Sequence, residues 1–278
     1  MVFVLNARHL RRRGTSLCLG ARFWTAFMHR DQLRPYGVMM AAAMLAAAAT
    51  AHAAPPVQTS PQPSPPSSQP PDFVATYTIA WHGVTAGKST LHLRRTAPQL
   101  YLYTSTDTAY GIFRLAFPHP LLQSSRFRIT GGEVEPLAFQ TGGAGNDVIA
   151  QFDWKAGHVT GMAKGRLIDL KLQPGTQDPL SVQIAIMLAL QAQAAPESFW
   201  MLNTDEIDRF QYVRHEESTL DTPLGKLRTI LYTSHQPGSS KTTYLWLAPA
   251  LHYMPARAEQ RVKGSTQVVL QIREFKLD

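Results

Sequence analysis

Residues 73–278 alternate between apolar and polar side chains with a period of two, and this pattern constrains the fold more than any other feature of the chain. It is clearest in five segments: 76–81, 90–94, 126–129, 148–154 and 268–272. Successive side chains of a β-strand point to opposite faces, so the pattern is typical of half-buried antiparallel strands. Glycine-containing turn sequences separate the segments. Together these signals predict about ten to twelve strands.

One segment, 179–195, has a different pattern. Asp178-Pro179 is a typical helix start, because aspartate caps free N–H groups and proline suits the first helical position. The following residues are apolar all the way round the expected helix, which indicates that other structure encloses it. The helix is too short for a comfortable membrane span, and it contains Gln183 and Gln191. We therefore expect an α+β, mostly β fold: a strongly curved antiparallel sheet, a half-barrel or open barrel, wrapped around one buried apolar helix.

The N-terminal region has the three parts of a secretory signal. Met28 opens a basic stretch, an apolar run covers 38–51, and the small-x-small sequence 51–53 follows. We expect residues 28–53 to be a signal peptide cleaved near Ala53, which predicts export to the periplasm of a Gram-negative bacterium with no stable membrane span afterwards. Residues 1–27 are then a spurious or leader extension.

Composition divides the rest of the chain into a linker and one domain. Residues 54–72 hold eight prolines, four serines and three glutamines, which predicts a disordered linker. A single β-rich domain is expected over 73–278.

Charge and cysteine content exclude several classes of function for the exported part. Residues 1–53 hold seven arginines and one aspartate, so the remaining 20 basic and 18 acidic side chains leave a net charge of about +2, and no nucleic-acid partner is expected. The single cysteine, Cys18, precedes the signal. A disulfide framework, a thiolate metal site and a cysteine nucleophile are therefore not expected.

Short motifs along the domain resemble the exported bacterial family known as domain of unknown function 3108. They match in order and spacing: Trp81-His82-Gly83-Val84-Thr85-Ala86-Gly87, Gln177-Asp178-Pro179-Leu180-Ser181, Thr222-Pro223-Leu224-Gly225 and Met254-Pro255-Ala256-Arg257. The resemblance implies a periplasmic protein without an assigned activity and a curved sheet similar to that of lipoprotein carriers. Five residues in these motifs are expected to have structural roles: Gly87, Asp178, Pro179, Gly225 and Pro255.

No catalytic or cofactor motif is recognisable. The histidines form no pair at metal-ligand spacing, so neither a metal site nor a cofactor is expected. Asp178 and Ser181 could form half of a hydrolytic site, but a helix cap and a first-turn serine explain both. No G-x-S-x-G sequence occurs in the domain.

The aromatic residues of the strands carry the functional prediction. An apolar groove between sheet and helix would be lined by Tyr77, Trp81, Phe127, Trp154, Trp200 and Trp246. The segment 199–202, outside any periodic run, would be a mobile flap over it.

The sequence leaves three functions open: a non-catalytic envelope protein that binds an apolar small molecule or lipid, an uncharacterised periplasmic hydrolase, and a structural or partner-binding envelope protein. Oligomeric state is left open as well.

Overall fold

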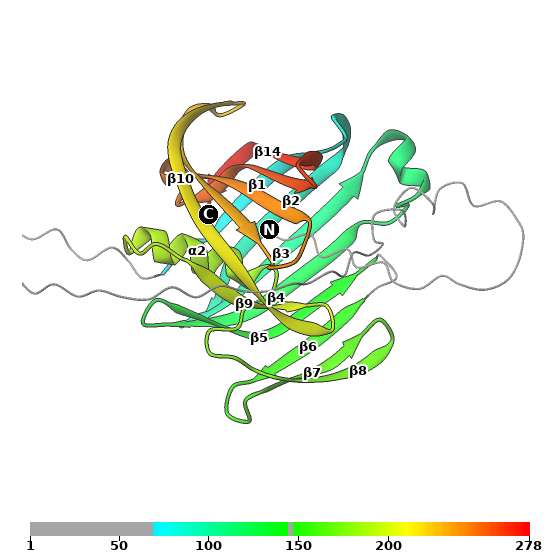
Figure 1. Ribbon diagram of the computed structural model, residues 1–278, viewed down its shortest axis with the longest axis vertical. Coiled ribbons are helices and arrows are strands. Elements are labelled where there is room, and N and C mark those ends of the chain that lie inside the picture. The colour runs from blue at the N-terminus through cyan, green and yellow to red at the C-terminus, as the bar shows by residue number, and fades with distance from the viewer. Residues whose placement is uncertain (1–68, 144–146) are drawn as a thin grey trace, which may run out of the picture.

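The computed structural model describes residues 69–143 and 147–278 (Figure 1). The predicted signal peptide, the residues before it and most of the predicted linker lie outside the described residues. The last linker residues contact the strands. Asp72 Oδ1 accepts a hydrogen bond from the backbone N–H of Arg95 at 2.9 Å, and Gln69 Oε1 accepts one from Arg95 Nη1 at 3.2 Å.

The described residues contain one α-helix, two 3-10 helices and fourteen strands, more strands than the ten to twelve expected. The first eight strands are β1 (Phe73–Trp81), β2 (Val84–Ala97), β3 (Leu100–Ala109), β4 (Leu121–Thr130), β5 (Glu133–Gly142), β6 (Val148–Asp153), β7 (His158–Ala163) and β8 (Arg166–Lys171). The rest are β9 (Ser198–Asn203), β10 (Glu206–Thr222), β11 (Gly225–His235), β12 (Lys241–Ala248), β13 (Met254–Val262) and β14 (Ser265–Leu277). Helix α2 (Ser181–Gln191) joins β8 to β9, while η1 (Gly111–Leu115) and η2 (Pro249–Leu251) lie between strands.

All fourteen strands belong to one antiparallel sheet. Its order is β8-β7-β6-β5-β4-β3-β2-β1-β14-β13-β12-β11-β10-β9, so every neighbouring pair except β1–β14 is also consecutive in the chain. The sheet is not closed into a barrel, because β8 and β9 do not pair with each other in the described part of the chain. An ion pair of 2.7 Å between Lys164 and Asp205 nevertheless joins the β7–β8 turn to the β9–β10 turn. Figure 1 shows the sheet strongly curved, with α2 near β9.

The period of two in the sequence is visible in the burial of the strands. On β1, Phe73, Ala75 and Tyr77 are buried, with half-buried residues between them. The Tyr101 ring on β3 stacks on Phe127 of β4 at 5.7 Å between centroids. Gly87 on β2 leaves room for the neighbouring strand, since a Cβ atom there would lie 2.3 Å from the carbonyl oxygen of Thr108.

Helix α2 begins close to the expected residue but ends earlier than Ala195. Asp178 Oδ1 accepts hydrogen bonds from the backbone N–H groups of Leu180 and Ser181, both at 2.8 Å, so it caps the first turn. At the other end, Gln193 adopts φ +58° and its N–H bonds to the carbonyl of Leu190, while the N–H of Ala194 bonds to that of Ala189. This is the Schellman arrangement, which terminates a helix without glycine or proline. Eight of the eleven helix residues are buried.

Candidate ligand-binding site

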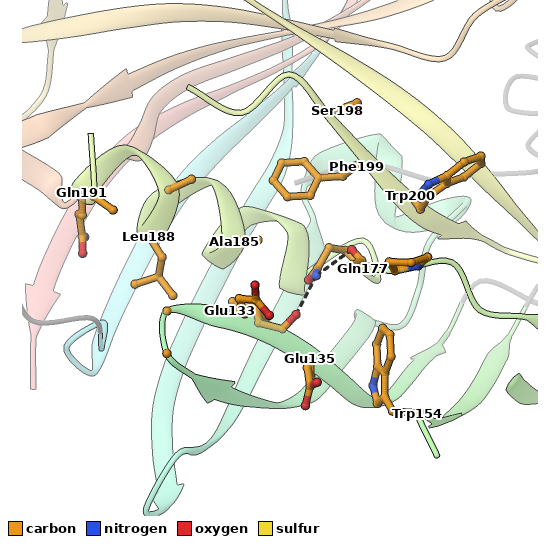
Figure 2. Close-up of a pocket in the computed structure, with 17 residues that line it drawn as sticks. Glu133, Glu135, Trp154, Gln177, Ala185, Leu188, Gln191, Ser198, Phe199 and Trp200 are labelled. Carbon is orange, nitrogen blue, oxygen red and sulfur yellow. Dashed lines mark hydrogen bonds between the residues drawn. The ribbon is translucent and has the colours of Figure 1, made fainter. Parts of the chain in front are cut away.

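A cavity of about 620 Å³ lies where α2 approaches β5 and β9 (Figure 2). Five pieces of chain form its wall: the β4–β5 turn with the start of β5, Trp154 just after β6, the segment 174–177 before the helix, one side of α2 with Ala192 after it, and the start of β9. The cavity thus occurs next to the opening of the sheet. It depends on residues far apart in the sequence, from Gly131 to Trp200.

Most side chains that line the cavity are apolar or aromatic. Ala185 and Leu188 face it from α2, Phe199 and Trp200 from β9, and Trp154 from the end of β6. The Phe199 ring makes an edge contact with Tyr212 at 5.5 Å. Trp154 Nε1 donates a hydrogen bond to the Pro136 carbonyl at 2.7 Å, so the indole presents its apolar ring to the cavity with its N–H already satisfied.

Gln177 connects β9 to β5. Its backbone N–H donates to the Trp200 carbonyl and its own carbonyl accepts from the N–H of Leu202, both at 2.8 Å, which forms a parallel bridge to β9. Its side-chain Nε2 donates to the carbonyls of Val134 on β5 at 2.8 Å and of Gly175 at 3.1 Å. The residue is 2% exposed, and its Oε1 has no hydrogen-bond partner among the described residues.

The polar rim of the cavity is acidic. Glu133 is exposed, and no cation pairs with it in the part of the chain that the structure describes. Glu135 accepts a hydrogen bond from Arg128 Nε at 3.0 Å, so its charge is balanced. These glutamates also line an adjoining polar cavity of about 380 Å³ that includes Arg128. Glu133 thus places one unpaired negative charge at the rim, while the Arg209 guanidinium lies 6.0 Å from the centroid of the Trp200 ring on the β9 side.

The suggested hydrolytic pair Asp178 and Ser181 lies outside this cavity, in the core. Besides its two backbone bonds, Asp178 accepts a bond of 2.5 Å from the Ser125 hydroxyl on Oδ2. Ser181 Oγ accepts from the Asp178 N–H at 2.9 Å and donates to the Asp178 carbonyl at 3.3 Å. Burial raises the pKa of Asp178 to about 6, although hydrogen bonds from Ser125, Ser181 and Leu180 oppose the shift. The arrangement is that of a buried helix cap.

Only two of the six predicted ligand-binding residues, Trp154 and Trp200, line the cavity. Tyr77 and Phe127 are buried in the core, where the Tyr77 hydroxyl donates to the Pro255 carbonyl at 2.8 Å. Trp81 lies elsewhere, in edge contact with Phe113 at 6.0 Å.

Trp246 lies on the other face of the sheet. It shares β12 with Leu245 and Leu247, which are buried, and alternates with them. Its ring stacks on Tyr244 at 6.2 Å, and the Arg257 guanidinium lies 5.7 Å from the ring centroid.

The segment predicted as a mobile flap is instead strand β9. Phe199 and Trp200 pair with Phe210 and Arg209 of β10. The sequence pattern missed this strand, because Phe199, Trp200, Met201 and Leu202 are all apolar and do not alternate. Gln177 was also missed as a cavity residue, since nothing in its type or spacing distinguishes it from a residue that precedes a helix cap.

Two general features of the described residues complete the description of the site. No group of three or more His, Cys, Asp or Glu residues among them could hold a metal ion. Within the same residues, no helix combines the length and apolar character that crossing a membrane would need.

Residues 76–271 match a family described as a protein of unknown function, DUF3108. No curated protein matches the chain. Among solved structures, a β-barrel-like protein of the domain of unknown function DUF1849 from Brucella abortus is similar, at 11% identity and a TM-score of 0.49, covering 75% of this chain and 98% of that one.

Two other solved structures are more distant. A candidate exported protein with a YmcC-like fold from Bacteroides fragilis shares 10% identity, with a TM-score of 0.28 and coverage of 73% of this chain and 95% of that one. A candidate lipoprotein from Parabacteroides distasonis shares 12% identity, with a TM-score of 0.32 and coverage of 75% and 96%. Similarities this low carry no functional argument.

Proposed function

Since the chain belongs to the DUF3108 family of proteins of unknown function, we propose its function from the cavity itself: a non-catalytic envelope protein that binds an apolar small molecule or lipid between α2, β5 and β9. In this proposal the curved sheet wraps around α2. The cavity then lies beside β9, one of the two edge strands of the open sheet.

The observation that supports the proposal is the combination of size and lining. A volume of about 620 Å³ falls in the range typical of small-molecule sites, which are mostly apolar with a few placed polar groups. Here Leu188, Phe199, Trp154 and Trp200 supply the apolar wall, and Gln177 is the buried polar group. An acyl chain or another apolar group would bury its surface against them, which is favourable by roughly 25 cal/mol per Å².

An envelope location is part of the same proposal. It is supported by the signal-like sequence at 28–53, with cleavage after Ala53. Fractionation of cells that express the full chain should then recover the protein with periplasmic markers.

Tryptophan emission provides the test of ligand binding, because Trp154 and Trp200 line the cavity. An apolar probe such as decanol should change the emission saturably, with a dissociation constant in the micromolar range, which corresponds to about −8 kcal/mol. Trp200→Phe should reduce this signal and weaken binding. The matched control Trp246→Phe, on the opposite face of the sheet, should leave the affinity as it is.

Mass spectrometry separates this function from the alternatives. Protein purified without detergent should carry apolar molecules, and Leu188→Gln should release them. A preparation that contains no such molecule, and that binds no apolar probe, would refute the proposal and leave the hydrolase and the partner-binding protein.

A further inference from the structure

The segment around η1 exposes an unusual amount of apolar surface. No residue of η1 is buried, and the side chains of Ile112 and Leu115 are 77% and 87% exposed. Three further exposed apolar side chains lie close by in the chain or on the adjoining strand ends: Val84, Tyr110 and Leu122. Apolar side chains gathered at one place on a surface mark sites of protein or membrane interaction.

Contacts with the sheet keep η1 in place. The Tyr110 N–H donates to the Ala86 carbonyl on β2 at 2.8 Å, and the N–H of Phe117 donates to the Phe113 carbonyl at 2.9 Å. The Phe113 ring makes its edge contact with Trp81 at the end of β1. One aromatic residue of η1 thus packs on the sheet, while its apolar neighbours remain at the surface.

A second group of exposed apolar residues lies at the same end of the sheet. Since β4 starts after η1 and the strands alternate in direction, β6 and β8 also start at this end and β7 ends there (Figure 1). Met162 of β7 lies directly opposite Ile149 of β6 and Leu167 of β8, so the three form a row on one face. The side chain of Leu167 is 85% exposed.

The two groups together form one surface, which we call the rim patch. Eleven large apolar side chains are exposed in the described part of the chain, and eight of them belong to the rim patch. The patch follows the strand ends from β2 to β8, about 29 Å along the rim at about 4.8 Å per strand. We propose that this end of the protein docks on the surface of an anionic phospholipid bilayer.

The charge next to η1 favours an anionic surface. Segments 81–88 and 108–123 contain no aspartate or glutamate, whereas Lys88 and Arg114 are exposed within them. Arg114 lies between Ile112 and Leu115 in the chain, an arrangement in which apolar side chains enter the interface and the guanidinium stays among the headgroups.

Around the row on β6–β8 the charges balance. Lys164 pairs with Asp205 at 2.7 Å, and the exposed Arg166 and Asp147 have opposite signs. The excess positive charge of the rim patch is therefore on the η1 side, and we expect η1 to make the closest contact with the bilayer.

The rim patch and the cavity lie at opposite ends of the sheet. Strand β4 starts at Leu121, beside η1, and ends at Thr130, next to the cavity residue Gly131. Ten residues of extended chain separate the two places by about 30 Å. Docking on a bilayer therefore leaves the cavity unobstructed, and it does not require a ligand in the cavity.

Sedimentation with lipid vesicles tests the docking. Protein recovered without detergent from cells that express the full chain should bind vesicles of phosphatidylcholine and phosphatidylglycerol, and bind pure phosphatidylcholine more weakly. The double variant Ile112→Gln, Leu115→Gln should bind the mixed vesicles at least about tenfold more weakly, and Leu167→Gln should also weaken binding. Arg114→Gln should lose about fivefold on mixed vesicles and nothing on pure phosphatidylcholine.

Leu277→Gln is the matched control, because this leucine is 54% exposed at the opposite end of the sheet and should have no effect on vesicle binding. Wild-type protein that binds mixed vesicles no better than pure phosphatidylcholine would overturn the proposal. So would a double variant or a Leu167→Gln variant that binds as tightly as wild type. A wild-type dimer that the double variant converts to a monomer would show that a second copy of the chain covers the rim patch instead. None of these results affects ligand binding in the cavity, which the emission assay measures separately.

Discussion

Replacing Asp178 by asparagine should make the protein more stable at neutral pH and reduce the dependence of its stability on pH. The wild-type carboxyl is fully buried, and burial raises its pKa to about 6. Asparagine keeps an oxygen for the N–H groups of Leu180 and Ser181, and its NH₂ can donate to the Ser125 hydroxyl. It therefore preserves the helix cap and removes the charge.

The magnitude follows from the two pKa values of Asp178. The unfolded carboxyl titrates at its ordinary 3.8 and the folded one at about 6, so the folded state holds the proton more tightly. The free energy of unfolding is therefore highest below about pH 4, falls as the pH rises to about 6, and stays low above that. At about 1.4 kcal/mol for each unit of pKa difference, the loss by pH 7 is about 3 kcal/mol.

Urea unfolding between about pH 4 and pH 8 measures this effect. Asp107 contributes in the same direction, since burial also raises its pKa to about 6 against hydrogen bonds from Ser89 and Ser105. We therefore expect Asp178→Asn to reduce the fall in unfolding free energy between about pH 4 and pH 8, and Asp107→Asn to reduce it by a similar amount. Asp178→Ala, which loses the cap, should be about 1 kcal/mol less stable than Asp178→Asn. If the unfolding free energy of Asp178→Asn depends on pH as strongly as that of wild type, burial does not raise the pKa of this carboxyl, and the reasoning is refuted.

Substitutions at two sites test the fold, and one measurement on the unaltered chain tests the processing. Ile184→Asp places an unpaired carboxylate in the core and should lower the free energy of unfolding by several kcal/mol, whereas Ile184→Val should lower it by about 1 kcal/mol. A soluble Asp variant that unfolds cooperatively would contradict the burial of α2. Gly87→Ala drives a methyl group against the Thr108 carbonyl and should lower the melting temperature, while the same change at the open turn position Gly83 should have only the smaller cost of its positive φ. N-terminal sequencing of exported protein should find Ala54 first; a protein that retains 38–51 would disprove the cleavage.

The sequence predicted secondary structure best where a pattern within a few consecutive residues is sufficient. Alternation identified the strands that have one buried face, such as β1 and β6, and the Asp178-Pro179 pair located the start of α2. Alternation failed for β9, whose residues 199–202 are all apolar. The sequence also did not predict the early end of the helix. That end depends on a left-handed conformation at Gln193, which glutamine rarely adopts and which its residue type does not indicate.

By itself the sequence determined the antiparallel strands, the single apolar helix and the family, since each depends on neighbours along the chain. Only the tertiary structure decided which aromatic side chains meet. Alternation says that Trp246 and Leu245 face opposite sides of β12 but not which side is the core, and the core lies on the Leu245 side. The cavity is likewise a tertiary property, because α2, β5 and β9 meet there through the curvature of the whole sheet. The free oxygen of Gln177 is the extreme case: it exists only because two carbonyls from elsewhere in the fold take both hydrogens of the amide.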